Sequence, residues 1–132
     1  MKKILSVALL SISIISCSKE TKLNGNKYIL KSSNGSDILL TFSENENRIS
    51  GKVVNNYFGN YEVSNDNKIS FGPIASTMMM GPVKDMETEQ NFFKFMNTVN
   101  NYEINENNLT LTGKDGSFMK FEKIQEIPNN LK

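Results

Sequence analysis

The 132-residue chain contains no histidine and no tryptophan, and its single cysteine is Cys17. Histidine is the side chain that most often titrates near neutral pH, and it is the commonest metal ligand. Its absence excludes Ser–His and Cys–His nucleophile systems and conventional zinc sites. With one cysteine the chain cannot form an internal disulfide. We therefore expect no catalytic residues, no cofactor and no metal.

The chain also lacks an excess of charge of either sign. Its formal net charge is +1, and loss of Lys2 and Lys3 with a cleaved leader would leave about −1. A protein without a basic patch does not attract nucleic acid or an anionic lipid surface toward its folded domain. We expect no nucleic-acid partner.

The first 17 residues have the pattern of an export signal. Lys2 and Lys3 precede an apolar run from Ile4 to Ile15, which is shorter than the ~20 residues of a membrane-spanning helix. The run ends in Ile14-Ile15-Ser16-Cys17, which resembles the lipobox of bacterial lipoproteins. That resemblance implies cleavage before Cys17, a diacylglycerol on its sulfur and an acylated amino terminus. The alternative is an ordinary secretory signal with a chance cysteine.

A lipid on Cys17 would anchor the protein to a membrane of the bacterial cell envelope, with the domain outside the cytoplasm. In an organism with two membranes this would be the outer membrane. We expect a signal peptide over residues 1–16, a tether over 17–24, one folded domain over 25–124 and a tail over 125–132.

Most of the expected domain alternates apolar and polar residues with a period of two, and turn residues recur every eight to twelve positions. This pattern predicts antiparallel strands. Turns are expected at Asn65-Asp66-Asn67, Asn107-Asn108 and Asp115-Gly116. The predicted strands are Lys27–Lys31, Ile38–Phe42, Arg48–Val54, Phe58–Ser64, Lys68–Phe71, Tyr102–Asn105, Leu109–Thr112 and Phe118–Lys123.

Between Asp85 and Asn101 the apolar period changes to 3.6, which predicts an amphipathic helix. Its buried face would be formed by Phe92, Phe95, Met96 and Val99. Lys94 and Asn97 would face solvent, and Asp85 or Thr88 would cap the start. The sequence therefore predicts an α+β fold. A curled antiparallel sheet of about eight strands, partly barrel-like, receives one helix before the last three strands.

Four short segments occur in an order and spacing typical of one family. They are Ile49-Ser50-Gly51 followed by Asn55 and Gly59, Thr77-Met78-Met79-Met80, Met86-Glu87-Thr88-Glu89 followed by Phe92-Phe93, and Asn108-Leu109-Thr110-Leu111. Together they resemble the META domain of HslJ-like bacterial lipoproteins, over roughly Leu23 to Ile124. The resemblance implies a small envelope module associated with stress and drug tolerance, with no established catalytic residues.

The chain departs from this family at two positions. Many bacterial relatives carry a cysteine just before the central asparagine and another just after the methionine pair. Val54 and Gly81 occupy these positions here. The resemblance implies that the two positions lie close together, so we expect Val54 and Gly81 to be neighbours. Gly81 is also a candidate for a positive φ.

The run Met78-Met79-Met80 has two interpretations. Thioethers are soft ligands that suit copper(I). In an extended segment Met78 and Met80 would share a face, and Met86 would have to fold back to supply a third sulfur. The interpretation that we favour from sequence is structural, with the methionines filling irregular space where a loop crosses the sheet.

A polar and aromatic cluster is predicted between two strands, formed by Asn55, Tyr57, Gly59 and Tyr61. It could line a shallow ligand cleft together with Thr77 and the methionines. In the structural interpretation, which we favour, Gly51 and Gly59 permit bulges that curl the sheet, and Asn55 hydrogen-bonds a tight turn.

Glu44 and Glu46 are expected to be solvated in a turn, and Glu87 and Glu89, two positions apart on a helix, are expected not to face one another. Neither pair is expected to act as a glycosidase pair. The function that we expect is non-enzymatic. A lipid-anchored, monomeric envelope domain would contribute to envelope integrity or to stress and drug tolerance by binding an envelope protein or a small ligand. The alternative is an envelope-bound inhibitor of a protein such as a cell-wall-degrading enzyme.

Overall fold

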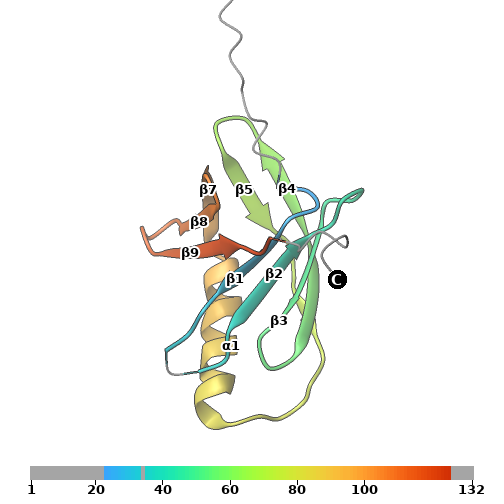
Figure 1. The fold of residues 1–132 in the computed structure, drawn as a ribbon, viewed down its shortest axis with the longest axis vertical. Coiled ribbons are helices and arrows are strands. Elements are labelled where there is room, and N and C mark those ends of the chain that lie inside the picture. The colour runs from blue at the N-terminus through green and yellow to red at the C-terminus, as the bar shows by residue number, and fades with distance from the viewer. Residues whose placement is uncertain (1–22, 34, 126–132) are drawn as a thin grey trace, which may run out of the picture.

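The computed structural model describes residues 23–33 and 35–125. The signal peptide, Cys17, most of the tether and nearly all of the tail lie outside the described residues, so the predictions made for them stay predictions. The described chain forms one helix and nine strands (Figure 1). They are β1 (Lys27–Leu30), β2 (Ile38–Phe42), β3 (Arg48–Lys52), β4 (Asn56–Ser64), β5 (Lys68–Phe71), β6 (Ala75–Ser76), α1 (Val83–Met96), β7 (Val99–Asn105), β8 (Asn108–Gly113) and β9 (Phe118–Lys123).

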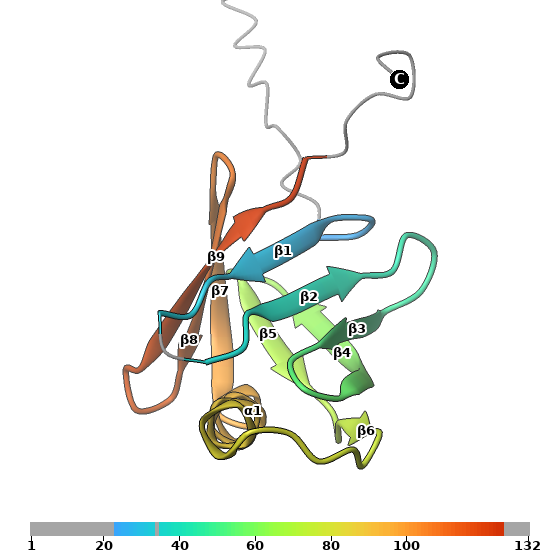
Figure 2. The ribbon, with the colours of Figure 1, turned by 60° about the horizontal axis from the view of Figure 1, so that its bottom comes forward.

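The strands form a closed antiparallel barrel, which confirms the predicted fold class. The sheet order is β3-β2-β1-β9-β8-β7-β5-β4, and β3 also pairs with β4. This last pairing closes eight strands into a ring, and the two-residue β6 is added outside the ring on β4 (Figure 2). Closure leaves no long unpaired edge on these eight strands.

Side chains that alternate along each strand fill the barrel. In β2, Ile38, Leu40 and Phe42 are buried, and in β8 the same holds for Leu109 and Leu111. This is the period-two pattern that predicted the strands. The barrel interior therefore supplies most of the apolar burial that stabilises the domain.

The helix α1 places Phe92 between opposite walls of the barrel. The ring of Phe92 lies 5.3 Å from that of Tyr57 in β4 and 6.4 Å from that of Phe121 in β9. These two strands are four steps apart in either direction around the ring. Phe95 and Met96 are buried as predicted, and Lys94 and Asn97 are exposed as predicted.

Both ends of the helix differ from the sequence prediction. α1 begins at Val83, with Pro82 at the N-cap position and no side-chain cap, so neither Asp85 nor Thr88 caps it. The first two residues, Val83 and Lys84, were missed because both are exposed and do not reveal the helical period. Val99 is buried, but as the first residue of β7 and not as part of the helix. The helix is neither long nor apolar enough to cross a membrane.

Three smaller predictions about the strands were also wrong. The third strand ends at Lys52 and not at the predicted Val54, and the fourth begins at Asn56, two residues before the predicted Phe58. The turn between β7 and β8 is Glu106-Asn107, where Glu106 has a φ of 56°, and Asn108 belongs to β8. The predicted turn at Asn65-Asp66-Asn67 is confirmed, with positive φ at its last two residues.

We predict that Phe92→Ala lowers the free energy of unfolding by about 3–5 kcal/mol, because it empties the centre of the barrel next to Tyr57 and Phe121. The exposed Lys94→Ala in the same helix is the control and should change it by less than about 0.5 kcal/mol. Urea denaturation followed by circular dichroism measures both. Equal effects of the two substitutions would contradict this account of the core.

Candidate functional site

Asn55, between β3 and β4, is buried at 3% exposure and uses all of its side-chain hydrogen-bonding groups. Its Nδ2 donates to Glu89 Oε2 at 2.9 Å and to the Met79 carbonyl at 3.2 Å. Its Oδ1 accepts from Thr77 Oγ1 at 2.9 Å and from the Met79 backbone N–H at 2.6 Å. An asparagine side chain offers two donors and two lone pairs, so Asn55 is saturated. We call Asn55, Glu89, Thr77 and Met79 the asparagine clamp.

The partner of Asn55 on the helix is a buried carboxylate. Glu89 is 3% exposed, and it accepts from the Asn55 backbone N–H through Oε1 at 2.7 Å as well as from the side-chain amide. A buried charge is tolerated only when donors of this kind surround it. From the sequence Glu89 was expected only not to face Glu87, and its burial was not predicted. The spacing of Glu89 in the sequence did indicate this burial, because Phe92, Phe93 and Met96 follow it at i+3, i+4 and i+7.

The clamp holds the chain between β6 and α1 through the backbone of Met79. Both the N–H and the carbonyl of Met79 pair with the Asn55 amide, as one strand residue pairs with another. A further backbone bond joins the Thr77 N–H to the Asn56 carbonyl at 3.0 Å. The loop therefore keeps its path without help from the methionine side chains.

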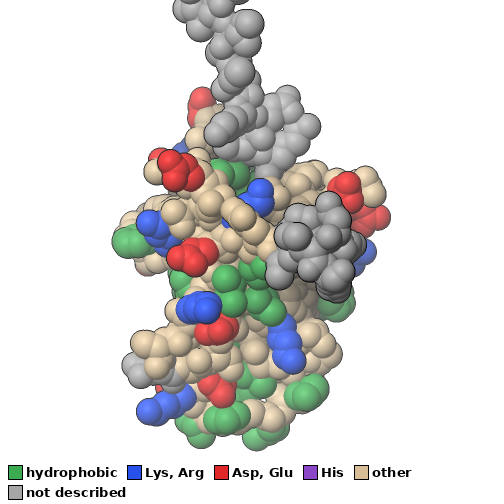
Figure 3. Space-filling view, in the orientation of Figure 1, with side chains coloured by type: hydrophobic (Ala, Val, Ile, Leu, Met, Phe, Trp, Pro, Cys, Tyr) green, Lys and Arg blue, Asp and Glu red, His purple; other side chains and the backbone are tan. Residues whose placement is uncertain are grey.

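Those side chains face solvent. Met78 is 95% exposed, Met79 63% and Met80 91%. The structural interpretation favoured from sequence, that they fill irregular space where a loop crosses the sheet, is wrong for these three residues. Val83, at the start of α1, is also exposed. We call Met78, Met79, Met80 and Val83 the methionine surface. Figure 3 shows hydrophobic atoms along the lower edge of the molecule, where Figure 1 places the loop before α1.

A hollow of about 280 Å³ lies between the methionine surface and the clamp. Met86 and Phe93 of α1 line it with the three loop methionines, and Asn55 and Glu89 also border it. Apolar side chains and sulfur thus surround a hydrogen-bond network whose oxygen and nitrogen atoms are already paired with each other.

The other members of the predicted cluster do not join this hollow. Tyr57 is buried in the barrel, where its hydroxyl donates to the Leu39 carbonyl at 2.6 Å, and burial raises the pKa of its phenol far above the ordinary value. Tyr61 lies farther along β4, where its hydroxyl donates to Asn24 Oδ1 at 2.9 Å. The four residues therefore do not line a single cleft.

The two glycines of this region have a different role from the predicted one. Gly51 and Gly59 lie in regular β3–β4 pairs, so the prediction that they form bulges was wrong. A Cβ on Gly51 would collide with the Leu39 carbonyl and with the Tyr57 phenol. A Cβ on Gly59 would come within 3.2 Å of the Pro73 carbonyl. Glycine is needed at these positions because other atoms approach the backbone closely.

Val54 and Gly81 are neighbours, as the family resemblance implied. A Cβ built on Gly81 would lie 2.8 Å from Val54 Cγ1. The two Cα atoms are therefore at most about 7 Å apart, and this bound is close to the largest Cα–Cα separation that a disulfide spans. Gly81 does not have a positive φ, contrary to expectation. The Val54 side chain thus places apolar bulk directly beside the backbone of Gly81.

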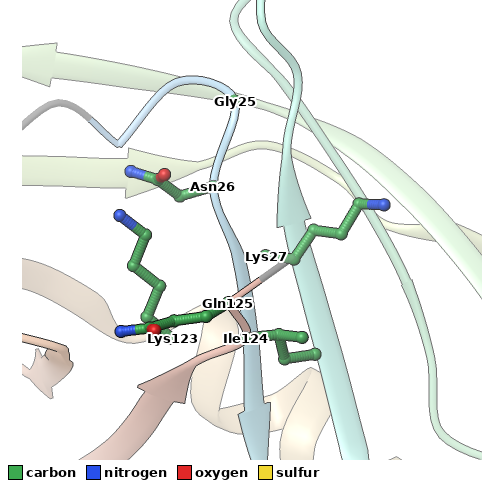
Figure 4. Close-up of a pocket in the computed structure, with 6 residues that line it drawn as sticks. All are labelled: Gly25, Asn26, Lys27, Lys123, Ile124 and Gln125. Atoms are coloured by element: carbon green, nitrogen blue, oxygen red, sulfur yellow. The ribbon is translucent and has the colours of Figure 1, made fainter. Parts of the chain in front are cut away.

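A second hollow, of about 350 Å³, lies beside the start of β1 and the end of β9 (Figure 4). Its lining residues are Gly25, Asn26, Lys27, Lys123, Ile124 and Gln125. Lys27 points away from Lys123 and Asn26, and the lining offers no carboxylate side chain and no activated nucleophile. In the described part of the chain, no three histidine, cysteine, aspartate or glutamate side chains come together as a possible metal site.

We predict that Asn55→Ala lowers the free energy of unfolding by about 3–5 kcal/mol, because it leaves the buried Glu89 carboxylate without its amide donor. It should also release the backbone of Met79, which hydrogen exchange of the loop amides would detect. Asn56→Ala is the matched control, because that side chain is exposed and its backbone bond to Thr77 is retained. Loop exchange that is unchanged in Asn55→Ala would refute the clamp.

We predict that the double substitution Val54→Cys with Gly81→Cys forms a disulfide in air, because a Cβ built on Gly81 falls next to the Val54 side chain. The positions are 27 apart in sequence, and closing such a loop contributes up to about 3–4 kcal/mol before any strain. Thiol titration and the difference in melting temperature with and without reductant measure the result. Val54→Cys alone is the control. Persistent free thiols in the double variant would show that the geometry is wrong.

Comparison with known proteins agrees with this fold. A solved NMR structure of a protein from Burkholderia xenovorans is 19% identical over 79% of this chain and 85% of its own, with a TM-score of 0.66. A second NMR structure is also 19% identical, over 75% of this chain and 89% of its own, with a TM-score of 0.58. No curated protein matches the chain. The profile of the META domain matches residues 19–126, which is most of the chain, and this protein therefore belongs to the META domain family.

Proposed function

We propose that this META-domain protein is a lipid-anchored, non-enzymatic component of the bacterial cell envelope. In this proposal it contributes to envelope integrity or to stress and drug tolerance by binding another envelope protein. The observation that carries the proposal is the methionine surface, in which three adjacent methionines are exposed on a backbone that partly buried hydrogen bonds hold in place.

Exposed clusters of large apolar side chains are characteristic of interaction sites. Methionine suits such a site because its flexible, polarizable side chain adapts to different partner shapes. Here the clamp fixes the backbone of Met79, so binding would require only side-chain ordering. Such preorganisation lowers the entropic cost of association.

The position of the methionine surface supports a protein partner over the anchoring membrane. The two ends of the described chain lie together, since the Ile124 N–H donates to the Lys27 carbonyl at 2.7 Å. Figures 1 and 2 place the start of β1 and the end of β9 in the upper part of the molecule and the loop before α1 at the bottom. A tether that reaches the domain at Leu23 would therefore leave the methionine surface directed away from the lipid.

The chemistry of the buried polar groups supports a non-enzymatic role. Glu89 is the one buried carboxylate among the described residues, and both of its oxygens accept from Asn55. Tyr57 is held by a backbone carbonyl. Neither group is positioned to exchange a proton with a substrate.

We predict that Cys17→Ser yields an unlipidated precursor, because the chain has no other thiol to accept a diacylglycerol. Membrane fractionation and intact-mass measurement would compare it with the wild-type protein, and Ser18→Ala is the adjacent control. A Cys17→Ser protein that keeps the mass of the wild-type protein and still partitions fully into detergent would rule out the lipid anchor.

The binding proposal is tested by crosslinking in cells with the lipidated protein, followed by reconstitution with the purified partner. Met78→Ser, Met79→Ser and Met80→Ser combined should abolish the crosslink and weaken the reconstituted complex at least tenfold. Val63→Ser combined with Phe118→Ser removes exposed apolar side chains elsewhere and should leave both unchanged.

Equal capture by the two combined variants, or no complex on reconstitution, would overturn the proposal. A partner that degrades the cell wall and loses activity in the complex would instead favour the inhibitor alternative.

A further inference from the structure

The hollow beside the asparagine clamp is unusually rich in sulfur. Four of the chain's seven methionines, Met78, Met79, Met80 and Met86, line it. Three of the four are largely exposed. Packing in the core therefore does not account for their gathering at one place, and apolar bulk alone does not require thioethers.

The structure brings a third sulfur to the hollow that Met78 and Met80 line. Met78 and Met80 lie on either side of Met79, whose backbone the Asn55 amide holds. Met86, one turn into α1, folds back toward the loop. Its sulfur lies 3.9 Å from the Cβ position of Gly81, the residue that directly follows Met80.

The other polar groups of the hollow are already occupied. Both oxygens of Glu89 accept hydrogen bonds from Asn55, and the Asn55 oxygen accepts from Thr77 and Met79. No cluster of histidine, cysteine, aspartate or glutamate lies within the described residues to compete. Ligands available to a metal here are thioether sulfurs, which are soft and neutral. They bind soft monovalent ions and bind zinc, magnesium and calcium poorly.

We propose that Met78, Met80 and Met86 form a copper(I) site. Each sulfur donates one lone pair to the metal, no proton or electron is transferred, and the bound ion keeps its single positive charge. This proposal rests on the proposed function in one respect, namely that export places the metal site in the cell envelope. It does not require a protein partner, because it depends on the sulfur atoms and not on the apolar bulk of the surface.

The test uses the lipidated full chain in detergent micelles, with Ag(I) as a redox-inert probe and Cu(I) under anaerobic conditions. Native mass spectrometry should show one Ag(I) per chain. Methionine-methyl NMR should show shifts at Met78, Met80 and Met86, whereas Met96 and Met119, which do not line the hollow, stay unchanged. Zn²⁺ at the same concentration should bind at least a hundredfold more weakly.

The combined variant Met78→Leu, Met80→Leu and Met86→Leu keeps the apolar volume and removes the sulfurs. Its affinity for Ag(I) should fall at least tenfold, and Met119→Leu is the matched control. An affinity within twofold of the unmodified protein would overturn the metal site. Because the methyl shifts are recorded on the unmodified chain, the ligand set is decided even if Met86→Leu disturbs the helix.

The same variant separates the two proposals. Leucine retains the apolar surface, so partner capture should survive the loss of Ag(I) binding if both proposals hold. Ag(I) binding that persists in the leucine variant refutes the metal site, whatever happens to partner capture. If the wild-type protein fails to capture a partner, the binding proposal is refuted. The Ag(I) measurement still decides whether the metal site exists.

Discussion

The structure depends most on one buried amide. The side chain of Asn55 joins the β3–β4 connection to two later segments, the loop before α1 and α1 itself. Each of these bonds is buried or partly buried, where an unpaired donor or acceptor costs more than a formed bond contributes. Loss of Asn55 would leave both Glu89 and the Met79 backbone without these partners, so the three segments are ordered together.

The barrel explains why such a connection is needed. Every second side chain of the barrel strands points into its interior, and Phe92 from α1 occupies the space between β4 and β9. The helix is thus part of the core, but the loop that leads into it buries almost none of its side chains. Apolar packing orders the helix and the barrel, whereas polar contacts made by Asn55 order the loop between β6 and α1.

Periodicity predicted the strands, the buried face of α1 and the fold class, because these depend on which side chains leave water. It missed the start of α1, whose first turn is polar or exposed around Val83 and Lys84. It extended the helix to Val99 because a strand residue that points inward also falls at i+7. Sequence patterns predicted neither the exposure of the loop methionines nor the burial of Glu89. Both depend on Asn55, which holds the loop and pairs with Glu89, 34 positions later in the chain.

The way in which the loop is held has a consequence for how this fold can diversify. Asn55 forms hydrogen bonds with the backbone N–H and carbonyl of residue 79, and every amino acid except proline provides both groups. The side chains at 78 and 80 contribute almost no burial. Substitution at those positions therefore carries little folding penalty, and the exposed chemistry of the loop can change without destabilising the barrel. The same scaffold can present sulfur, aromatic or charged side chains to solvent, because the backbone atoms of this short segment hold it in place.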